Sequence, residues 1–220
     1  MKYLAIRGCR IGEGRPKVIL PIVEQTEEAI LEKAAQFSTW KADCVEWRVD
    51  LFADAQDLSA VARCAAKLRV ALKDKLLLIT FRTKAEGGHA ALSHEEYRRY
   101  FHTVLDTDCA DLIDLEFFTA GADLPGLIAD AHTAGAAVIC SSHDFQKTPP
   151  KAELVDRMVR MQQAGADLPK LAVMPRSRTD VLTLLAATAE MADCHPDTPV
   201  ITMSMGALGA VSRLAGEVFG

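Results

Sequence analysis

The chain has 220 residues, of which half are hydrophobic and a quarter are charged, and its formal net charge is -5. This length and composition are typical of one ordinary globular domain with a substantial core. The negative charge argues against a nucleic-acid surface, and the sequence has no apolar run long enough to span a membrane. We therefore expect neither nucleic acid nor membrane among its partners.

The N-terminal residues lack the pattern of a secretory signal, because the apolar stretch after Met1 breaks at Arg7 and Gly8. The six cysteines are scattered, and no two of them form a C-x-x-C pair. Both features are typical of a cytoplasmic protein whose cysteines are reduced. The histidines do not have the spacing of a metal site, so the sequence predicts no metal.

The predicted elements begin with a hairpin and continue as a regular alternation of strands and helices. Residues 3–7 and 9–16 are expected to form the hairpin, with glycines near its turns. Short apolar strands are predicted at 18–23, 44–49, 76–81, 111–117, 136–141, 168–173 and 200–203. Helices are predicted at 26–37, 57–72, 93–106, 124–134, 150–164, 178–192 and 207–215. No linker interrupts this alternation, so we expect a single domain over residues 1–220.

Seven strand–helix units with short connections predict a parallel sheet. The two main solutions are an open doubly wound sheet and a closed (β/α)8 barrel of the TIM type. An open nucleotide-binding sheet would favour a glycine-rich turn after its first strand, but residues 21–25 read Pro-Ile-Val-Glu-Gln. We therefore predict an α/β fold of the (β/α)8 barrel type with an N-terminal hairpin.

Polar residues recur toward the ends of the predicted strands. Alternate residues of a strand share a face, and strands that lie between covering helices have no solvated face. Asp114 and Glu116, for example, alternate with Ile113 and Leu115. Barrel enzymes build their sites at the C-terminal ends of the strands. The sequence predicts a site there that contains one amine, one imidazole, two carboxylates and three guanidiniums: Lys170, His143, Glu46, Glu86, Arg48, Arg82 and Arg213. Such a set suits a small, hydroxylated, anionic substrate with a carbonyl group.

Lys170 lies in the middle of the apolar run at residues 168–174. Lysine is strongly hydrated and is rarely buried without a partner. One explanation is a stem that follows apolar surface while its ammonium reaches water. The other is an amine desolvated in a pocket, with its pKa lowered so that it can attack a carbonyl. The polar residues of the neighbouring strands favour the second explanation.

Five motifs, in chain order, resemble the type I 3-dehydroquinate dehydratases. They are EWRVD at 46–50, FRTKAEGG at 81–88, SHDFQKTP at 142–149, the Lys170 strand, and MSMGALGAVSR at 203–213. The resemblance implies dehydration of 3-dehydroquinate to 3-dehydroshikimate in the shikimate pathway of aromatic amino acid biosynthesis. It implies a lysine Schiff base, no metal or organic cofactor, a small-molecule carboxylate substrate and a homodimer.

The residue types and the resemblance assign the same roles. The imine on Lys170 would act as the electron sink, His143 would be the general base, and Glu86 would orient the imidazole. Substrate hydroxyls would be bound by Glu46, Arg48 and Arg82. Arg213 would bind the substrate carboxylate, helped by backbone amides of residues 206–209 at a helix start. Met203 and Met205 would form walls, and Asp50 would orient Arg48.

The sequence ends at Gly220, and residues 218–220 resemble the start of the family's last strand. We therefore expect a C-terminally truncated barrel that lacks the eighth strand, its helix and a covering loop, with weak binding and slow turnover. Two alternative functions remain open. One is a Schiff-base aldolase of the same architecture, and the other is a non-catalytic metabolite-binding barrel.

Overall fold

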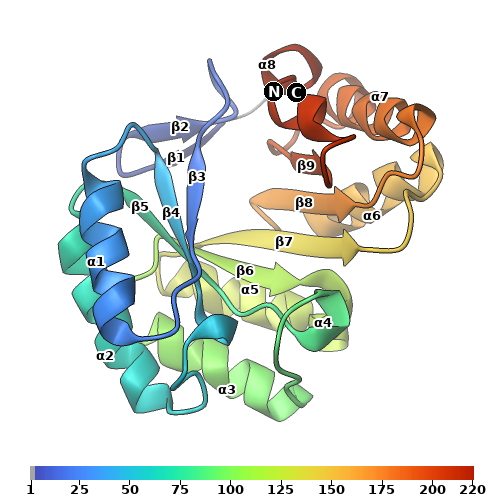
Figure 1. The fold of residues 1–220 in the computed structure, drawn as a ribbon. Coiled ribbons are helices and arrows are strands. Elements are labelled where there is room, and N and C mark those ends of the chain that lie inside the picture. The colour runs from blue at the N-terminus through green and yellow to red at the C-terminus, as the bar shows by residue number, and fades with distance from the viewer. Residues whose placement is uncertain (1–2) are drawn as a thin grey trace. The chain divides into compact units, whose positions relative to one another are not determined.

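The computed structural model describes residues 3–220 (Figure 1). The chain divides into two compact units. One unit is Lys17–Val138, and the other combines the residues up to Pro16 with Ile139–Gly220. Each unit has its own parallel strands and its own helices. The expected single domain over residues 1–220 stays a prediction.

The unit Lys17–Val138 contains four parallel strands in chain order: β3 (Ile19–Ile22), β4 (Cys44–Arg48), β5 (Leu76–Thr80) and β6 (Leu112–Glu116). Its longer helices are α1 (Glu27–Ser38), α2 (Leu58–Leu72), α3 (His94–Leu105) and α5 (Leu124–Thr133), joined by the short α4 (Phe117–Ala120). Three 3₁₀ turns follow strands or precede helices: η1 (Val49–Leu51), η2 (Lys84–Glu86) and η3 (Gly121–Asp123).

The second unit opens with an antiparallel hairpin of β1 (Leu4–Ile6) and β2 (Cys9–Ile11). Arg7 and Gly8 both have positive φ, as a two-residue hairpin turn requires. The unit continues with parallel strands: β7 (Ala137–Asp144) from Ile139 onward, β8 (Leu168–Val173) and β9 (Ile201–Ser204). Helix α6 (Lys151–Gln163) packs against β8 and against α7 (Arg178–Cys194). The 3₁₀ turn η4 (Ala210–Arg213) and the short α8 (Gly216–Phe219) follow β9.

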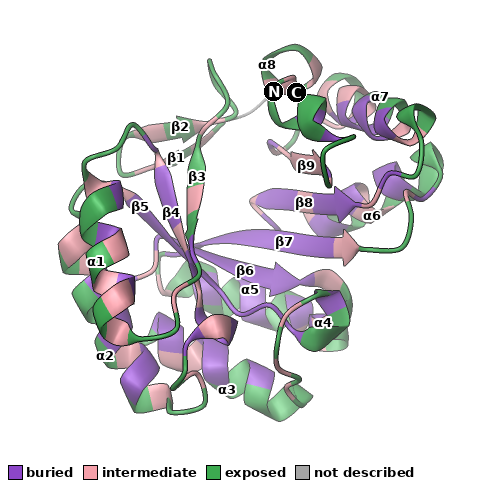
Figure 2. Cartoon of the chain, in the orientation of Figure 1, coloured by how far each residue is buried: buried purple, intermediate pink, exposed green. Residues whose placement is uncertain are grey.

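The predicted strands stand out as apolar runs because they are buried in the structure. Every residue of β5 and of β6 is buried, and Figure 2 shows these strands in purple together with most of β8. Parallel strands covered on both faces are typically apolar almost throughout, as β5 is, whereas β6 also carries Asp114 and Glu116. Leu77 and Ile79 of β5 are fully buried, and burying each such side chain contributes about 1.5–3 kcal/mol relative to leaving it exposed. Hydrophobic burial of these runs therefore holds the strands that carry the candidate site.

Helix starts follow their capping residues. Ser93 and Glu96 form a capping box at α3, and Ser177 with Asp180 forms one at α7. Hydrogen bonds from Ser93 lower the pKa of the Glu96 carboxyl, and the backbone amide of Arg176 lowers the pKa of Asp180. The Thr26 side chain likewise accepts a hydrogen bond from the Ala29 amide at the start of α1.

The predicted helix at 207–215 is wrong. The chain forms the four-residue turn η4 there, because Gly209 interrupts the segment and the Ser212 side chain competes for its backbone hydrogen bonds. Gly206 has a φ of +68°. The Ser204 amide donates to Ser212 Oγ at 2.9 Å, and Ser212 Oγ donates to the Gly209 carbonyl at 2.8 Å. Each glycine also costs about 1 kcal/mol in a helix relative to alanine.

The other predicted elements are confirmed, with ends shifted by a few residues. The largest shift in a strand is at β2, which ends at Ile11 instead of residue 16. Strand β7 continues to Asp144 and so includes His143. Residues 3–220 contain seven parallel strands and no eighth. Within the same residues, no helix is both long and apolar enough to cross a membrane.

Candidate active site

The predicted site residues lie on parallel strands or on the segments that follow them, and each unit contributes some of them. Glu46, Arg48, Arg82 and Glu86 belong to the unit Lys17–Val138. Five others belong to the second unit: His143, Lys170, Met203, Met205 and Arg213. Within each unit, parallel pairing decides which of these side chains are neighbours.

Arg48 is held in a fixed plane by Asp50. Arg48 ends β4, and its Nε and Nη2 atoms each lie 2.8 Å from a carboxylate oxygen of Asp50. Asp50 sits in η1, is buried, and also accepts a hydrogen bond of 3.2 Å from the Arg82 amide. A two-pronged pair of this kind fixes both the position and the plane of a guanidinium. The predicted role of Asp50 as the orienting partner of Arg48 is confirmed.

Glu46 is oriented from the neighbouring strand. The hydroxyl of Thr80 donates to Glu46 Oε1 at 2.7 Å. The parallel register sets Arg48 beside Thr80, and Thr80 beside Asp114. Polar groups of three strands therefore meet at one level of the sheet in this unit.

Arg82 is the centre of a buried ion-pair cluster. Its side chain lies 2.8 Å from Asp114, 3.0 Å from Glu116 and 3.6 Å from Glu86, with only 4% of the residue exposed. Burial alone would lower the pKa of the guanidinium, but the three carboxylates outweigh burial and raise that pKa. Arg82 is thus held as a cation by the protein's own carboxylates. Its predicted contact with substrate hydroxyls stays a prediction.

Asp114 and Glu116 were not among the predicted site residues. Both are fully buried on β6. The signal was present in the sequence, since these carboxylates alternate with Ile113 and Leu115 in a strand that has no solvated face. Buried carboxylates need partners, and Arg82 supplies one.

The loop after β5 presents Glu86. The amides of Glu86 and Gly88 donate to the Thr83 carbonyl at 3.0 and 2.8 Å, and the Lys84 amide donates to the Ala90 carbonyl at 2.8 Å. Gly87 has a φ of +86°, which favours glycine. The Glu86 side chain is buried at the end of this turn. The loop therefore needs both glycines, Gly87 for its φ and Gly88 for close packing.

Replacing Gly88 by alanine is expected to lower the free energy of unfolding by about 1–3 kcal/mol. A Cβ atom there would lie 1.8 Å from the Arg82 carbonyl oxygen and 2.4 Å from its carbon, so the backbone must move. Gly126→Ala is the matched control, because nothing lies within 4 Å of the position that its methyl group would take. Denaturant unfolding of both variants gives the comparison. Equal stability of Gly88→Ala and the parent chain would contradict this packing.

Lys170 and His143 share a face in the second unit. The register pairs Ser141 with Lys170, and His143 with Ala172. Alternate residues of a strand point the same way, so the Lys170 and His143 side chains leave one face, one strand and two residues apart. Lys170 is partly exposed, whereas Leu168 and Leu171 beside it are buried. The lysine is therefore set in an apolar strand while part of it remains accessible.

The strand end that carries His143 is held by its own loop. Asp144 Oδ1 accepts hydrogen bonds from the amides of Gln146 and Lys147 at 2.9 and 3.0 Å. Arg176 Nε donates to the Gln146 carbonyl at 2.9 Å. The ring of Phe145 stacks with the His143 ring, with 6.4 Å between the centroids. These contacts restrict where the imidazole can lie.

Strand β9 and the turn after it carry the last predicted residues. Met203 is in register with Ala172, the residue opposite His143, and the Met205 amide donates to the Val173 carbonyl at 2.9 Å. Both methionines are partly exposed, and Arg213 is exposed at the end of η4. Gly209 packs closely against the end of β9, since a Cβ there would lie 2.1 Å from the backbone carbonyl oxygen of Ser204. The substrate contacts of Met203, Met205 and Arg213 stay predictions.

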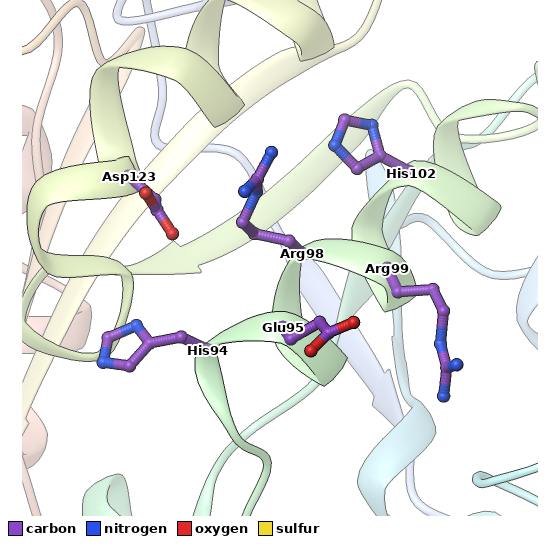
Figure 3. A pocket seen from close by; sticks show the side chains of 6 residues that line it. All are labelled: His94, Glu95, Arg98, Arg99, His102 and Asp123. Atoms are coloured by element: carbon purple, nitrogen blue, oxygen red, sulfur yellow. The ribbon is translucent and has the colours of Figure 1, made fainter.

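A hollow of about 630 Å³ on helix α3 contains none of the predicted residues. Figure 3 shows its lining side chains: His94, Glu95, Arg98, Arg99, His102 and Asp123. The four side chains that are charged at neutral pH balance in sign, and His102 faces Asp130 at 3.7 Å. This surface lacks the converging groups of a catalytic site. No group of three His, Cys, Asp or Glu residues within 3–220 is placed to hold a metal ion.

Comparison with known proteins decides the family. The sequence model of type I 3-dehydroquinase matches residues 18–220. This chain belongs to the type I 3-dehydroquinase family. The 3-dehydroquinate dehydratase of Bacillus subtilis is 46% identical over all of the chain and 86% of its own length. The 3-dehydroquinate dehydratase of Salmonella agona is 44% identical, over all of the chain and 87% of its own length.

Solved structures of the family have the same fold. The type I 3-dehydroquinate dehydratase of Clostridium difficile matches all of the chain and 87% of its own, with a TM-score of 0.98 and 42% identity. The Enterococcus faecalis 3-dehydroquinate dehydratase matches 99% of the chain and 90% of its own, with a TM-score of 0.96 and 43% identity. The predicted family, the α/β barrel fold class and the prediction of an enzyme are confirmed. The truncation expected for this type I 3-dehydroquinase stays a prediction.

Proposed function

We propose that this chain dehydrates 3-dehydroquinate to 3-dehydroshikimate through a Schiff base on Lys170, as a step of the shikimate pathway. The observation that carries the proposal is the register of β7 and β8, which sets Lys170 and His143 on one face in a member of the type I 3-dehydroquinase family. The proposal includes a cytoplasmic homodimer that uses no metal or organic cofactor.

The chemistry needs one amine and one base. The neutral Lys170 amine attacks the substrate ketone, and loss of water gives an imine. Protonation of the imine makes the adjacent C–H acidic, and His143 removes that proton to give an enamine. The enamine then expels the β-hydroxyl as water, which takes its proton from the His143 imidazolium. Water hydrolyses the remaining imine, so the product leaves, Lys170 is regenerated and one water is lost overall.

The charged residues fit the substrate's other groups. Arg48, held in plane by Asp50, and Glu46, held by Thr80, would bind hydroxyls. Arg82 would also bind hydroxyls, and Arg213 would bind the carboxylate. Met203 and Met205 would form apolar walls. Glu86 would accept the hydrogen bond that orients the His143 imidazole.

Two rival functions are less well supported. A Schiff-base aldolase would share Lys170, but membership of the 3-dehydroquinase family favours dehydration. A non-catalytic barrel would not need an amine, an imidazole and a carboxylate together, and Lys170, His143 and Glu86 are all present. A panel of phosphorylated aldehydes tested as substrates separates the aldolase from the dehydratase. The Clostridium difficile relative was solved with covalent modified comenic acid, which agrees with covalent chemistry in the family.

Borohydride reduction in the presence of 3-dehydroquinate tests the proposal. Reduction traps an imine as a stable amine, and peptide mass spectrometry then locates the adduct. We expect one adduct, on Lys170, together with formation of 3-dehydroshikimate by the untreated protein. No adduct, or an adduct on another lysine, would remove the Schiff base from the proposal. Conversion of a phosphorylated aldehyde, with 3-dehydroquinate left unchanged, would favour the aldolase.

A further inference from the structure

Glu116 accepts four hydrogen bonds on one buried carboxylate. Its Oε1 atom accepts from Arg82 Nη1 at 3.0 Å and from the Thr83 amide at 2.8 Å. Its Oε2 atom accepts from the hydroxyls of Thr83 and Thr119, each at 2.6 Å. The residue is fully buried at the end of β6, where its own amide donates to Tyr97 Oη at 2.8 Å.

Four donors fill this carboxylate. An ionised carboxylate offers about four lone-pair positions, and the protein occupies all of them at Glu116. A proton or a substrate hydroxyl would have to displace one of these donors. Glu116 is therefore unsuited to act as an acid, a base or a substrate ligand. Its carboxylate instead holds the neighbouring donors in fixed positions.

Three of the four donors belong to the start of the loop that carries Glu86. Thr83 is linked to Glu86 by a backbone hydrogen bond, in which the Glu86 amide donates to the Thr83 carbonyl at 3.0 Å. Arg82 is linked to Glu86 by an ion pair, in which Arg82 Nη1 lies 3.6 Å from Glu86 Oε2. Arg82 Nη1 thus contacts the carboxylates of both Glu116 and Glu86. The fourth donor, Thr119, lies on α4 and holds the Glu116 carboxylate from that side.

We propose that Glu116 is a positioning residue that sets the place of Glu86 through Thr83 and Arg82. The inference rests on the proposed function, in which Glu86 orients the catalytic imidazole. Glu116 neither touches the substrate nor exchanges a proton. Its loss would move the Glu86 carboxylate, and a shift of about 1 Å in a supporting group can cost about 100-fold in rate.

A double-mutant cycle tests this role. Glu116→Gln keeps the shape of the side chain, but the amide nitrogen replaces an acceptor by a donor and the negative charge is lost. The cycle compares the parent chain, Glu116→Gln, Glu86→Gln and the double variant, with kcat and KM for 3-dehydroquinate and the melting temperature measured for each. We expect Glu116→Gln to lower kcat by about 10- to 100-fold and to change KM by less than about 3-fold. In the Glu86→Gln background the same change is expected to lower kcat by less than about 3-fold, because coupled residues are not additive.

Asp111→Asn is the matched control. Asp111 is also a buried carboxylate in this unit, next to the other end of β6, where it accepts from Arg69 Nη1 at 2.6 Å and the Leu77 amide at 2.8 Å. Its substitution is expected to lower the melting temperature while kcat stays within about 2-fold of the parent value. A role of Glu116 in stability alone would make the two variants behave alike. That result would overturn the proposal.

Two milder variants serve if Glu116→Gln does not fold. Thr83→Val and Thr119→Val each remove one hydroxyl donor and nearly preserve side-chain shape. Both are expected to lower kcat, and Glu86→Gln is expected to suppress both effects. Equal losses with and without Glu86→Gln would overturn the role of Glu116 and leave the proposed function intact. No dehydration by the parent chain, or no effect of Glu86→Gln, would refute the proposed function or its assignment of Glu86, and the present inference with it.

Discussion

Replacing Lys170 by alanine is expected to lower the turnover of 3-dehydroquinate by about 10⁴-fold or more, because no other group can form the imine. The borohydride adduct is expected to disappear as well. Lys170→Arg would behave in the same way, since a guanidinium stays protonated and cannot attack a carbonyl. The alanine variant places no cation at the site and the arginine variant places one, so their agreement would assign the loss to the amine itself. Steady-state kinetics and mass spectrometry give both results.

Lys151→Ala is the control for this prediction. Lys151 lies in the same unit, on α6, where its ammonium forms an exposed ion pair of 2.6 Å with Glu190. Exposed pairs of this kind contribute about 0–1 kcal/mol, so its loss should leave turnover almost unchanged. Lys170→Ala that retained both turnover and a reducible adduct would refute the proposed mechanism.

Replacing His143 by alanine is expected to lower kcat by about 10²- to 10⁴-fold while the adduct on Lys170 still forms. The reason is that the imidazole moves the carbon-bound proton, whereas the amine forms the imine. The parent chain should also lose kcat/KM at low pH as its base becomes protonated, and the variant should lose that pH dependence. Rapid-quench reduction measures how much adduct forms on Lys170. The pH dependence of kcat/KM shows whether the general base is present.

His102→Ala is the matched histidine control. His102 lies on α3 in the other unit, exposed beside Asp130. Its removal should change neither the adduct nor the pH profile. Loss of the adduct in His143→Ala would mean that His143 is needed for imine formation, and the separation of roles given above would be wrong.

Much of the fold could be predicted because its strands are covered. Buried parallel strands such as β5 and β8 are short apolar runs, and capped helices such as α3 and α7 lie between them. The segment 207–215 could not be predicted in the same way. Its apolar residues have a helical spacing, but Gly209 must pack against Ser204 and the Ser212 hydroxyl takes the backbone bonds. Those contacts depend on residues that a local pattern does not show.

The sequence by itself determined the family, the order of strands and helices, and the candidate residues Lys170, His143 and Glu86. These follow from local patterns and short motifs, because burial and chemistry restrict which residue types occur there. Only the tertiary structure decided which partner each charge takes. The sequence predicts Arg82 as a substrate-binding residue, and the structure adds that its guanidinium pairs with Asp114, Glu116 and Glu86. Ion pairs and hydrogen bonds act over a few ångströms. Strand register and loop packing, rather than separation along the chain, determine which groups come that close.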